Sequence, residues 1–254
     1  MKLRLFALAA LAFSIAALTR ADNYDSKETF TRTGAFDANG RVSLENINGD
    51  VDIRTWNKNE ILIEGEKSAK TDEELKLIDL KIELSGSEAT IKVHLPKRPG
   101  GFFANNIRAA VRFKLTVPAT AVLEKIASVN STVTVDGVRG SVRASTVNGS
   151  IHTMDLGSAA RLATVNGSIH ASFNALASGQ EISCKTVNGQ IHVTLPKDAG
   201  FELHSSTVNG GVDCDFPLES GKKRHGHSLS GKIGDGRASL EAETVNGGVH
   251  IASS

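Results

Sequence analysis

Histidine is the residue type whose spacing in this sequence could do chemistry. It recurs at the fourth position after the Asn of a repeated Thr-Val-Asn-Gly segment, and one copy has Asp there instead. Imidazole titrates close to neutral pH and is a common ligand of transition metals. If the copies stack in register, these side chains form one outward-facing row with neighbouring rings about 5 Å apart. This row is the candidate ligand-binding site, and its members are His152, His170, His192, Asp213 and His250.

Metal binding is one chemistry open to such a row. Two or three imidazoles at this spacing could share Zn²⁺, Ni²⁺ or Cu²⁺, with Asp213 as a further ligand. Metal sites usually collect ligands from different elements and hold them with outer hydrogen bonds, which a flat row lacks. The sequence therefore predicts a solvent-exposed row with no metal and no cofactor, and a metal or small-ligand binder is the alternative. Protonated neighbours in the row repel each other, so we expect stability to fall below about pH 6.

The elements that must position this row are copies of one heptapeptide. Asn-Gly between alternating residues is a strong signal for a tight hairpin turn. In this chain, however, the Asn residues of successive copies lie 18 to 22 residues apart, with 37 residues before the last copy. Repeats of about 20 residues are typical of a β-solenoid, in which each coil packs on its neighbours. The copies are TVNGSIH at Thr146–His152 and Thr164–His170, TVNGQIH at Thr186–His192, TVNGGVD at Thr207–Asp213 and TVNGGVH at Thr244–His250.

In stacked coils the repeated Asn predicts a structural ladder. Identical side chains then lie about 4.8 Å apart, so each carboxamide can hydrogen-bond the next one in chain order. Strand alternation predicts that the third and fifth positions after Asn point inward, because they are apolar or small. The ladder residues are Asn148, Asn166, Asn188, Asn209 and Asn246. The third-position column is Ile151, Ile169, Ile191, Val212 and Val249, and the fifth-position column is Thr153, Ala171, Val193, Cys214 and Ile251.

The chain before the repeats is predicted to be β-rich with one short helix. The helix is expected over Thr71–Asp79, where Thr71 and Glu74 form a capping box. Its apolar side would consist of Leu75, Leu77 and Ile78. Alternating segments between turn residues predict strands at Arg41–Glu45, Asp50–Arg54, Ile61–Glu64, Lys81–Leu84, Thr90–Leu95 and Val111–Val117, and Pro96–Gly101 is expected to be a loop.

Residues 1–21 have the features of a secretory signal peptide: a basic start, an apolar run over Leu5–Leu18 and small residues before Asp22. No other stretch approaches the ~20 apolar residues of a membrane-spanning helix. Removing the three basic residues of this leader leaves 26 basic against 28 acidic residues, a net charge of about −2. That balance gives no basic surplus for nucleic-acid binding. Export also allows a disulfide between Cys184 and Cys214, although two small buried thiols fit the sequence equally well.

Three segments outside the heptapeptides complete a wider pattern: NINGDVDI at Asn46–Ile53, FKLTVP at Phe113–Pro118 and GKIGDGRASL at Gly231–Leu240. Together with the TVNGSI repeats they resemble a bacterial family of exported proteins of unknown function, labelled putative adhesins. The resemblance covers most of the chain after the leader. It implies an all-β, solenoid-like repeat fold in the periplasm or on the cell surface, and it transfers no catalytic residues.

Other chemistries have weaker support in the sequence. The basic segment Lys222–His227 could contact anionic lipid or polysaccharide, but its composition favours a solvated loop. A β-helix can host carbohydrate-active enzymes, yet Asp136, Asp155 and Asp235 lie beside Gly, where Asp favours turns. No nucleophile, metal or phosphate-loop motif occurs in the sequence. One Trp and one Tyr also give little material for an aromatic sugar-binding platform.

These observations together predict an all-β protein in three parts: a signal peptide at residues 1–21, a β-rich N-terminal cap region at 22–120, and a short single-chain, β-helix-like solenoid of Asn-Gly repeats at 121–254. The expected function is that of a non-enzymatic, adhesin-like scaffold or binding protein of the envelope or cell surface. Its partner would be an unknown envelope or surface component. A carbohydrate-active enzyme and a metal or small-ligand binder are the alternatives. Because the last repeat ends at Ser254 without a cap, we expect a free strand edge there and self-association through that end.

Overall fold

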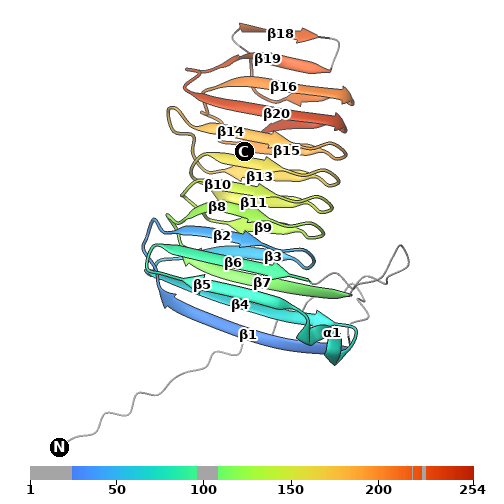
Figure 1. Cartoon of the computed structure of the whole chain (residues 1–254). Helices are drawn as coiled ribbons and strands as arrows, with labels where there is room; N and C mark the ends of the chain where they lie inside the picture. The colour runs from blue at the N-terminus through green and yellow to red at the C-terminus, as the bar shows by residue number, and fades with distance from the viewer. Residues whose placement is uncertain (1–24, 96–107, 219, 225–226) are drawn as a thin grey trace, which may run out of the picture.

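The structure is a computed structural model that describes residues 25–95, 108–218, 220–224 and 227–254. The expected signal peptide and the expected loop at Pro96–Gly101 lie outside the described residues. Within them the chain is almost entirely β-strand, with one short helix, and its strands form two large sheets that face each other (Figure 1). The prediction of an all-β chain is confirmed, and the two sheets are both mixed, with parallel and antiparallel pairs.

The two sheets are called sheet A and sheet B. In spatial order, sheet A consists of β1 (Ser26–Ala35), β4 (Glu60–Ala69), β7 (Ala109–Pro118), β3 (Val51–Trp56), β9 (Val133–Asp136), β11 (Ile151–Leu156), β13 (Ile169–Phe173), β15 (Ile191–Leu195), β21 (Val249–Ser253) and β17 (Val212–Cys214). Starting from the opposite end of the stack, sheet B consists of β18 (Ser220–Arg224), β19 (Ser228–Ile233), β16 (Phe201–Asn209), β20 (Ala238–Asn246), β14 (Glu181–Lys185), β12 (Ala160–Ala163), β10 (Val142–Ser145), β8 (Val122–Ala127), β2 (Arg41–Glu45), β6 (Glu88–His94) and β5 (Asp79–Leu84).

Consecutive strands from β8 to β17 alternate between sheet B and sheet A. Most of these strands are three to six residues long, and each TVNG segment makes the corner that carries the chain across. Within each sheet the neighbouring copies run parallel, as β11, β13 and β15 do. We call one sheet-B strand with the sheet-A strand that follows it a rung, so that β10–β11, β12–β13 and β14–β15 are successive rungs.

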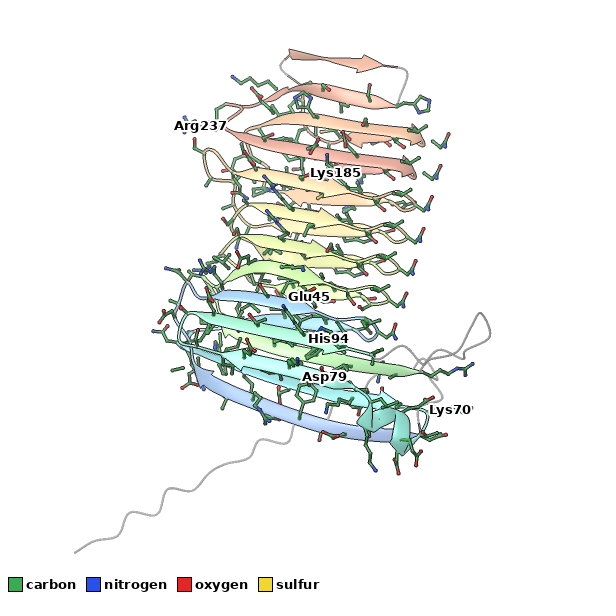
Figure 2. The ribbon with its side chains drawn as sticks, in the orientation of Figure 1. Glu45, Lys70, Asp79, His94, Lys185 and Arg237 are labelled. Carbon is green, nitrogen blue, oxygen red and sulfur yellow. The ribbon has the colours of Figure 1, made fainter. Side chains whose placement is uncertain are left out.

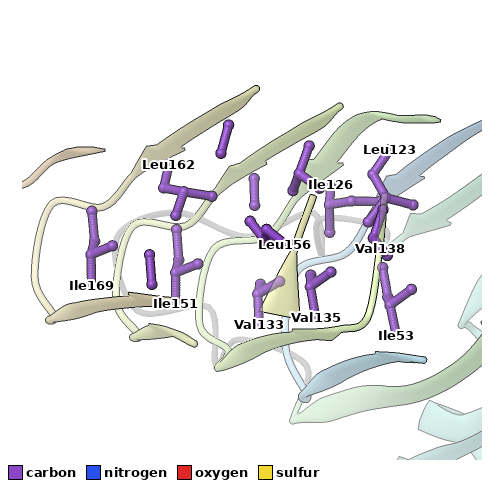
Figure 3. Packing of buried hydrophobic residues seen from close by; sticks show 14 of the residues in the cluster. Ile53, Leu123, Ile126, Val133, Val135, Val138, Ile151, Leu156, Leu162 and Ile169 are labelled. Atoms are coloured by element: carbon purple, nitrogen blue, oxygen red, sulfur yellow. The ribbon is translucent and has the colours of Figure 1, made fainter. Parts of the chain in front are cut away.

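The core lies between the two sheets and runs the length of the stack. Ile53, Val133, Ile151 and Ile169 project from sheet A toward Leu162 and its neighbours in sheet B (Figure 3). The predicted third-position column is buried at all five places, and the fifth-position column is buried except at Cys214, which is half-buried. Apolar burial from both sheets is therefore the main stabilising contribution to this fold.

The last repeat does not lie at the end of the stack. Strand β20 pairs with β14 on one side and β16 on the other, and β21 pairs in the same way with β15 and β17. Figure 1 accordingly places the C-terminus within the stack. The segment between these rungs forms an antiparallel hairpin, β18–β19, on the far edge of β16. The prediction of a free strand edge at the last repeat is thus wrong. The chain passes through this hairpin and returns to insert its final rung, β20–β21, inside both sheets.

The N-terminal strands continue the same two sheets. Strand β2 pairs with both β6 and β8, and β3 pairs with both β7 and β9, so both sheets cross residue 120 without interruption. The predicted helix is present as α1 (Asp72–Lys76), and the backbone N–H of Glu74 donates to the Thr71 hydroxyl at 3.2 Å. Its apolar side is smaller than expected, since Ile78 is buried but Leu77 is 41% exposed. No helix among the described residues has the length and apolar character of a membrane span.

The two cysteines are free thiols in the structure. Cys184 belongs to β14 of sheet B and Cys214 to β17 of sheet A, and the inserted rung β20–β21 lies between those strands. Burial raises the pKa of the Cys184 thiol to about 12. Of the two arrangements that the sequence allowed, the structure has the unbridged one, because the inserted rung separates the thiols.

Candidate ligand-binding site

The four repeat histidines form one row on the outer face of sheet A. The strand register places His170 beside both His152 and His192, and His250 beside His192. The centroids of neighbouring rings are 5.1, 6.1 and 4.9 Å apart along the row. Asp213 comes last, next to His250, so the spatial order differs from the chain order at this end. The order differs because the last rung, β20–β21, is inserted between β15 and β17 in sheet A.

The row faces solvent because its neighbours along each strand face the core. Ile169 and Ala171 flank His170 and are both buried, while the His170 side chain is exposed and His152, His192 and His250 are half-buried. Beyond His152 the same row continues over β9, β3, β7 and β4 as Thr134, Asp52, Lys114 and Glu64. The histidine section is therefore the part of this outer row that has no lysine or arginine in it.

Partial burial, and then the neighbouring imidazoles, lower the affinity of the two central imidazoles for protons. The pKa of His170 is lowered by partial burial and then by the neighbouring His152. The pKa of His192 is lowered by partial burial and by His250 and His170, and the charge of Asp215 opposes this shift. The centre of the row is therefore neutral near pH 7.

Asp215 is a member of the site that the sequence reasoning missed. Its Oδ1 lies 3.3 Å from Nε2 of His250, and its Oδ2 accepts a hydrogen bond from the backbone N–H of Ser253 at 3.3 Å. These bonds lower the pKa of the Asp215 carboxyl. Asp215 lies outside the repeated positions, and only the insertion of β21 beside β17 brings it to His250. No local sequence signal indicates that contact.

A shallow pocket of about 280 Å³ opens at this end of the row. His170, His192, His250 and Asp213 all line the pocket, whereas His152 lies farther along the row and does not. Among the described residues no three His, Cys, Asp or Glu side chains are grouped so that they could hold a metal ion. The pocket thus offers imidazole rings and a carboxylate to a ligand.

The corners that hold the rungs in register are built from the Thr, Asn and Gly of the repeat. The carboxamide of each repeat Asn bonds the next, at 2.7 to 2.9 Å, in the spatial order Asn130, Asn148, Asn166, Asn188, Asn246, Asn209. Asn246 thus stands between Asn188 and Asn209, and the order in space departs from the expected chain order. The Thr hydroxyl donates to a carbonyl of the adjacent rung, as Thr164 does to Gly149 at 2.8 Å. A Cβ on Gly149 would collide with the carbonyl oxygen of Ser131, so the corner requires Gly.

A stripe of exposed valines runs beside the Asn residues and was not foreseen from the sequence. It accounts for six of the eight large apolar side chains that are exposed among the described residues. The signal was present in the sequence, since every TVN segment has Val at the position before Asn. The stripe consists of Val129, Val147, Val165, Val187, Val245 and Val208.

The outer face of sheet B has a different character from the histidine row. Several of its charges are paired across strands: Lys185 lies 2.9 Å from Glu241 and 3.0 Å from Glu243, and Lys125 lies 3.0 Å from Glu45. Lys185 and Glu45 are labelled in Figure 2. The basic segment at its edge begins within strand β18, not in a loop, while residues 225–226 lie outside the described part. Sheet B thus presents cross-strand ion pairs on its outer face, and the row of four repeat histidines lies on sheet A.

Several solved structures align with this chain over most of their length. A "putative cell adhesion protein" from Clostridium sporogenes is 14% identical, with a TM-score of 0.47 over 89% of this chain and 100% of that one. A "putative adhesin" from Bacteroides fragilis is 9% identical, with a TM-score of 0.33 over 89% and 98% of the two chains. A "putative lipid binding protein" from Parabacteroides distasonis is 11% identical, with a TM-score of 0.28 over 87% and 96%.

No curated protein matches the chain in a sequence comparison. A protein family does match it: the family described as Toastrack DUF4097 covers residues 125–252, which is half of the chain and includes every rung from β10–β11 onward. The chain therefore belongs to the Toastrack DUF4097 family.

Proposed function

We propose that this protein is a non-enzymatic, adhesin-like scaffold and binding protein of the envelope or cell surface, and that the histidine row is its binding surface. The observation that carries the proposal is the alignment of His152, His170, His192 and His250 on the solvent face of sheet A. These rings are held in register by a buried core beneath them. A surface that is already ordered binds without the entropy cost of arranging it, which favours recognition by a rigid scaffold.

Export and the solenoid description belong to the same proposal. The basic start and apolar run of residues 1–21 support secretion to the periplasm or cell surface. The alternation of parallel strands from β8 onward supports a short β-solenoid over residues 121–254, with residues 22–120 as its β-rich cap. An unknown envelope or surface component is the proposed partner.

The enzyme alternative is not favoured by any observation in the described residues. Asp155, one of the acidic residues considered for catalysis, adopts a left-handed φ of 53° within β11, where the register with β13 shifts, and Asp235 accepts a hydrogen bond from the backbone N–H of Arg237 at 3.2 Å. Both features are those of turn-forming residues. The carboxylates therefore have local structural roles.

The test is binding of the purified protein, expressed with its own leader, to envelope isolated from the source cells. A double variant, His170→Ser and His192→Ser, should lower the amount that sediments with the envelope about tenfold. The matched control is His94→Ser with His204→Ser, which removes two exposed histidines from sheet B and should bind as the parent does. Equal binding by both double variants would contradict a role for the row.

A further inference from the structure

The pocket at the end of the histidine row owes its shape to two glycines. In the β10–β11, β12–β13 and β14–β15 rungs the second residue after the ladder Asn is Ser150, Ser168 or Gln190. In the last two rungs of the stack the same position is Gly248 and Gly211. Both glycines line the pocket, together with Gln190, His192, Asp213 and His250. The side chains of Ser150, Ser168 and Gln190 form a row beside the histidines. The pocket lies where this row ends, because Gly248 and Gly211 have no side chain.

Neither backbone conformation nor packing accounts for these two glycines. Gly211 and Gly248 are not among the residues with left-handed φ angles. A Cβ on Gly211 would meet nothing within 4 Å, and a Cβ on Gly248 would meet only the Gly211 carbonyl oxygen, at an ordinary contact distance of 3.6 Å. The corner glycine of the same rung, Gly247, is different, because a Cβ there would collide with the carbonyl oxygen of Gly189. Glycine destabilises a strand end, and no steric conflict requires it at these two positions. Its effect here is to keep the pocket open.

The missing side chains also release a hydrogen-bond donor. The Ser150 hydroxyl accepts from the backbone N–H of Ser168 at 3.2 Å, and the Ser168 hydroxyl accepts from that of Gln190 at 3.2 Å. Gly248 has no hydroxyl, so the backbone N–H of Gly211 lacks the side-chain acceptor that its counterparts have. A ligand in the pocket can supply that acceptor.

The charge around the pocket selects against anions. Asp213 is exposed, and Asp215 lies just behind His250. Because the pKa values of His170 and His192 are lowered, these two rings do not compensate the carboxylate charges near neutral pH. A neutral ligand with several hydroxyl groups fits better, because it can donate to Asp213 and accept from the amide of Gln190 and the N–H of Gly211.

The size and walls of the pocket point to a single sugar ring. Its volume of about 280 Å³ lies just below the range for drug-sized ligand sites, roughly 300–1,000 Å³, which suits a small ligand. The rings of His192 and His250 meet edge to face at 69° and give the pocket a small aromatic wall. Such a wall replaces the Trp or Tyr platform for which the sequence has little material.

We propose that the pocket between β15, β21 and β17 binds one unit of a neutral glycan, with Asp213, Gln190 and the Gly211 N–H bonding its hydroxyl groups and His192 and His250 packing against its ring. This inference deepens the proposed function and rests on it, since it names the class of ligand for one end of the same row.

The test uses the whole exported protein and defined sugars. Imidazole signals are followed by ¹H–¹⁵N NMR during titration with methyl glycosides of glucose, galactose, mannose and N-acetylglucosamine. At least one of them should shift the signals of His192 and His250 more than that of His152. Gly248→Gln should fill the pocket and raise the dissociation constant about tenfold. The matched control is Ser150→Gln, which adds the same side chain in the same row but outside the pocket lining and without a bond to Gln190, and it should leave the constant unchanged.

Three results would overturn the inference: no neutral glycoside binds, Gly248→Gln binds as well as the parent, or glucuronate binds more tightly than the neutral sugars. Thermal melting of both variants shows that the fold is intact, which the open space at Gly248 leads us to expect. Failure of the proposed envelope-binding function would give a different result. In that case the parent protein does not bind isolated envelope at all, whereas failure of the sugar inference alone leaves envelope binding in place and dependent on His170 and His192.

Discussion

At the residue scale, the histidine row is a set of ionisable groups packed closely enough to affect each other. Burial and neighbouring imidazoles lower the pKa of His170 and His192. A proton therefore binds these side chains more readily in the unfolded chain than in the folded one. The charge of Asp215 raises the pKa of His192 and so opposes this shift. Hydrogen bonds from His250 and the Ser253 backbone lower the pKa of Asp215 itself.

This linkage predicts that acid destabilises the protein. Since the folded pKa values are lowered, the stabilisation is complete above the ordinary histidine pKa of about 6.5 and is lost as the pH falls from there through the folded values. The melting temperature should decrease between about pH 7.5 and pH 5. The double variant His170→Gln with His192→Gln should show a smaller decrease, and His94→Gln with His204→Gln should follow the parent. The same pH slope in all three proteins would contradict the prediction.

The inward column gives a second prediction at this scale. Ile169 is 0% exposed between the sheets, and Val165, four residues earlier, is 39% exposed at the corner. Ile169→Ala should lower the free energy of unfolding by about 2–5 kcal/mol, because it removes buried methyl groups and leaves a cavity. Val165→Ala should lower it by less than about 1 kcal/mol. Urea denaturation measures both, and similar losses would show that the assigned faces are wrong.

At the element scale, the TVNG corner fixes one rung on the next. Thr donates to the adjacent rung, Asn continues the carboxamide row, and Gly allows the backbones to approach, which leaves Val as the residue that faces solvent. Contacts between rungs thus explain three of the four residues of the TVNG segment, namely Thr, Asn and Gly. The repeated Val is not explained by packing among the described residues.

The carboxamide row can be tested at one rung. Asn166 donates to Asn148 at 2.9 Å and accepts from Asn188 at 2.8 Å. Asn166→Ala removes both bonds and should reduce the free energy of unfolding by about 1–2 kcal/mol. Asn174→Ala is the control, since Asn174 is an exposed residue outside this row whose side chain makes one long bond, 3.5 Å, to Asp155. If the two variants melt alike, the row contributes nothing to stability.

At the scale of the whole molecule, the two sheets share one core from β1 to the hairpin β18–β19. The inserted rung β20–β21 is the element that completes the histidine row, the carboxamide row and the pocket together. The site therefore depends on the return of the chain after residue 237.

Hydrogen exchange tests this insertion. Strand β21 is paired on both sides, whereas β17 forms the edge of sheet A. The amides of Val249–Ser253 should therefore exchange as slowly as those of Ile191–Leu195 and more slowly than those of Val212–Cys214. Exchange of β21 at the rate of a frayed terminal strand would show that the last repeat lies at an end.

A feature of this structure could be predicted from the sequence when it depends on residues that are close together in the chain. Alternation identified the buried Ile169 column and most strands before the repeats, and the capping residues Thr71 and Glu74 located the helix, because these signals are local. Leu77 was assigned to the helix's apolar side and is exposed, since the helix ends before a further turn can bury it. Asp215 could not be found, because its partner His250 is 35 residues away in the sequence.

The sequence by itself determined that this chain is all-β, which residues face inward and where each corner falls, because strand periodicity and the needs of an Asn-Gly corner are properties of short segments. Only the tertiary structure decided which repeat lies beside which. Every TVNG copy offers the same Asn, the same β-branched anchor and the same corner, so any order of rungs satisfies the local pattern. The hairpin β18–β19 and its packing on β16 select the order in which β21 separates β15 from β17, and that order creates the pocket.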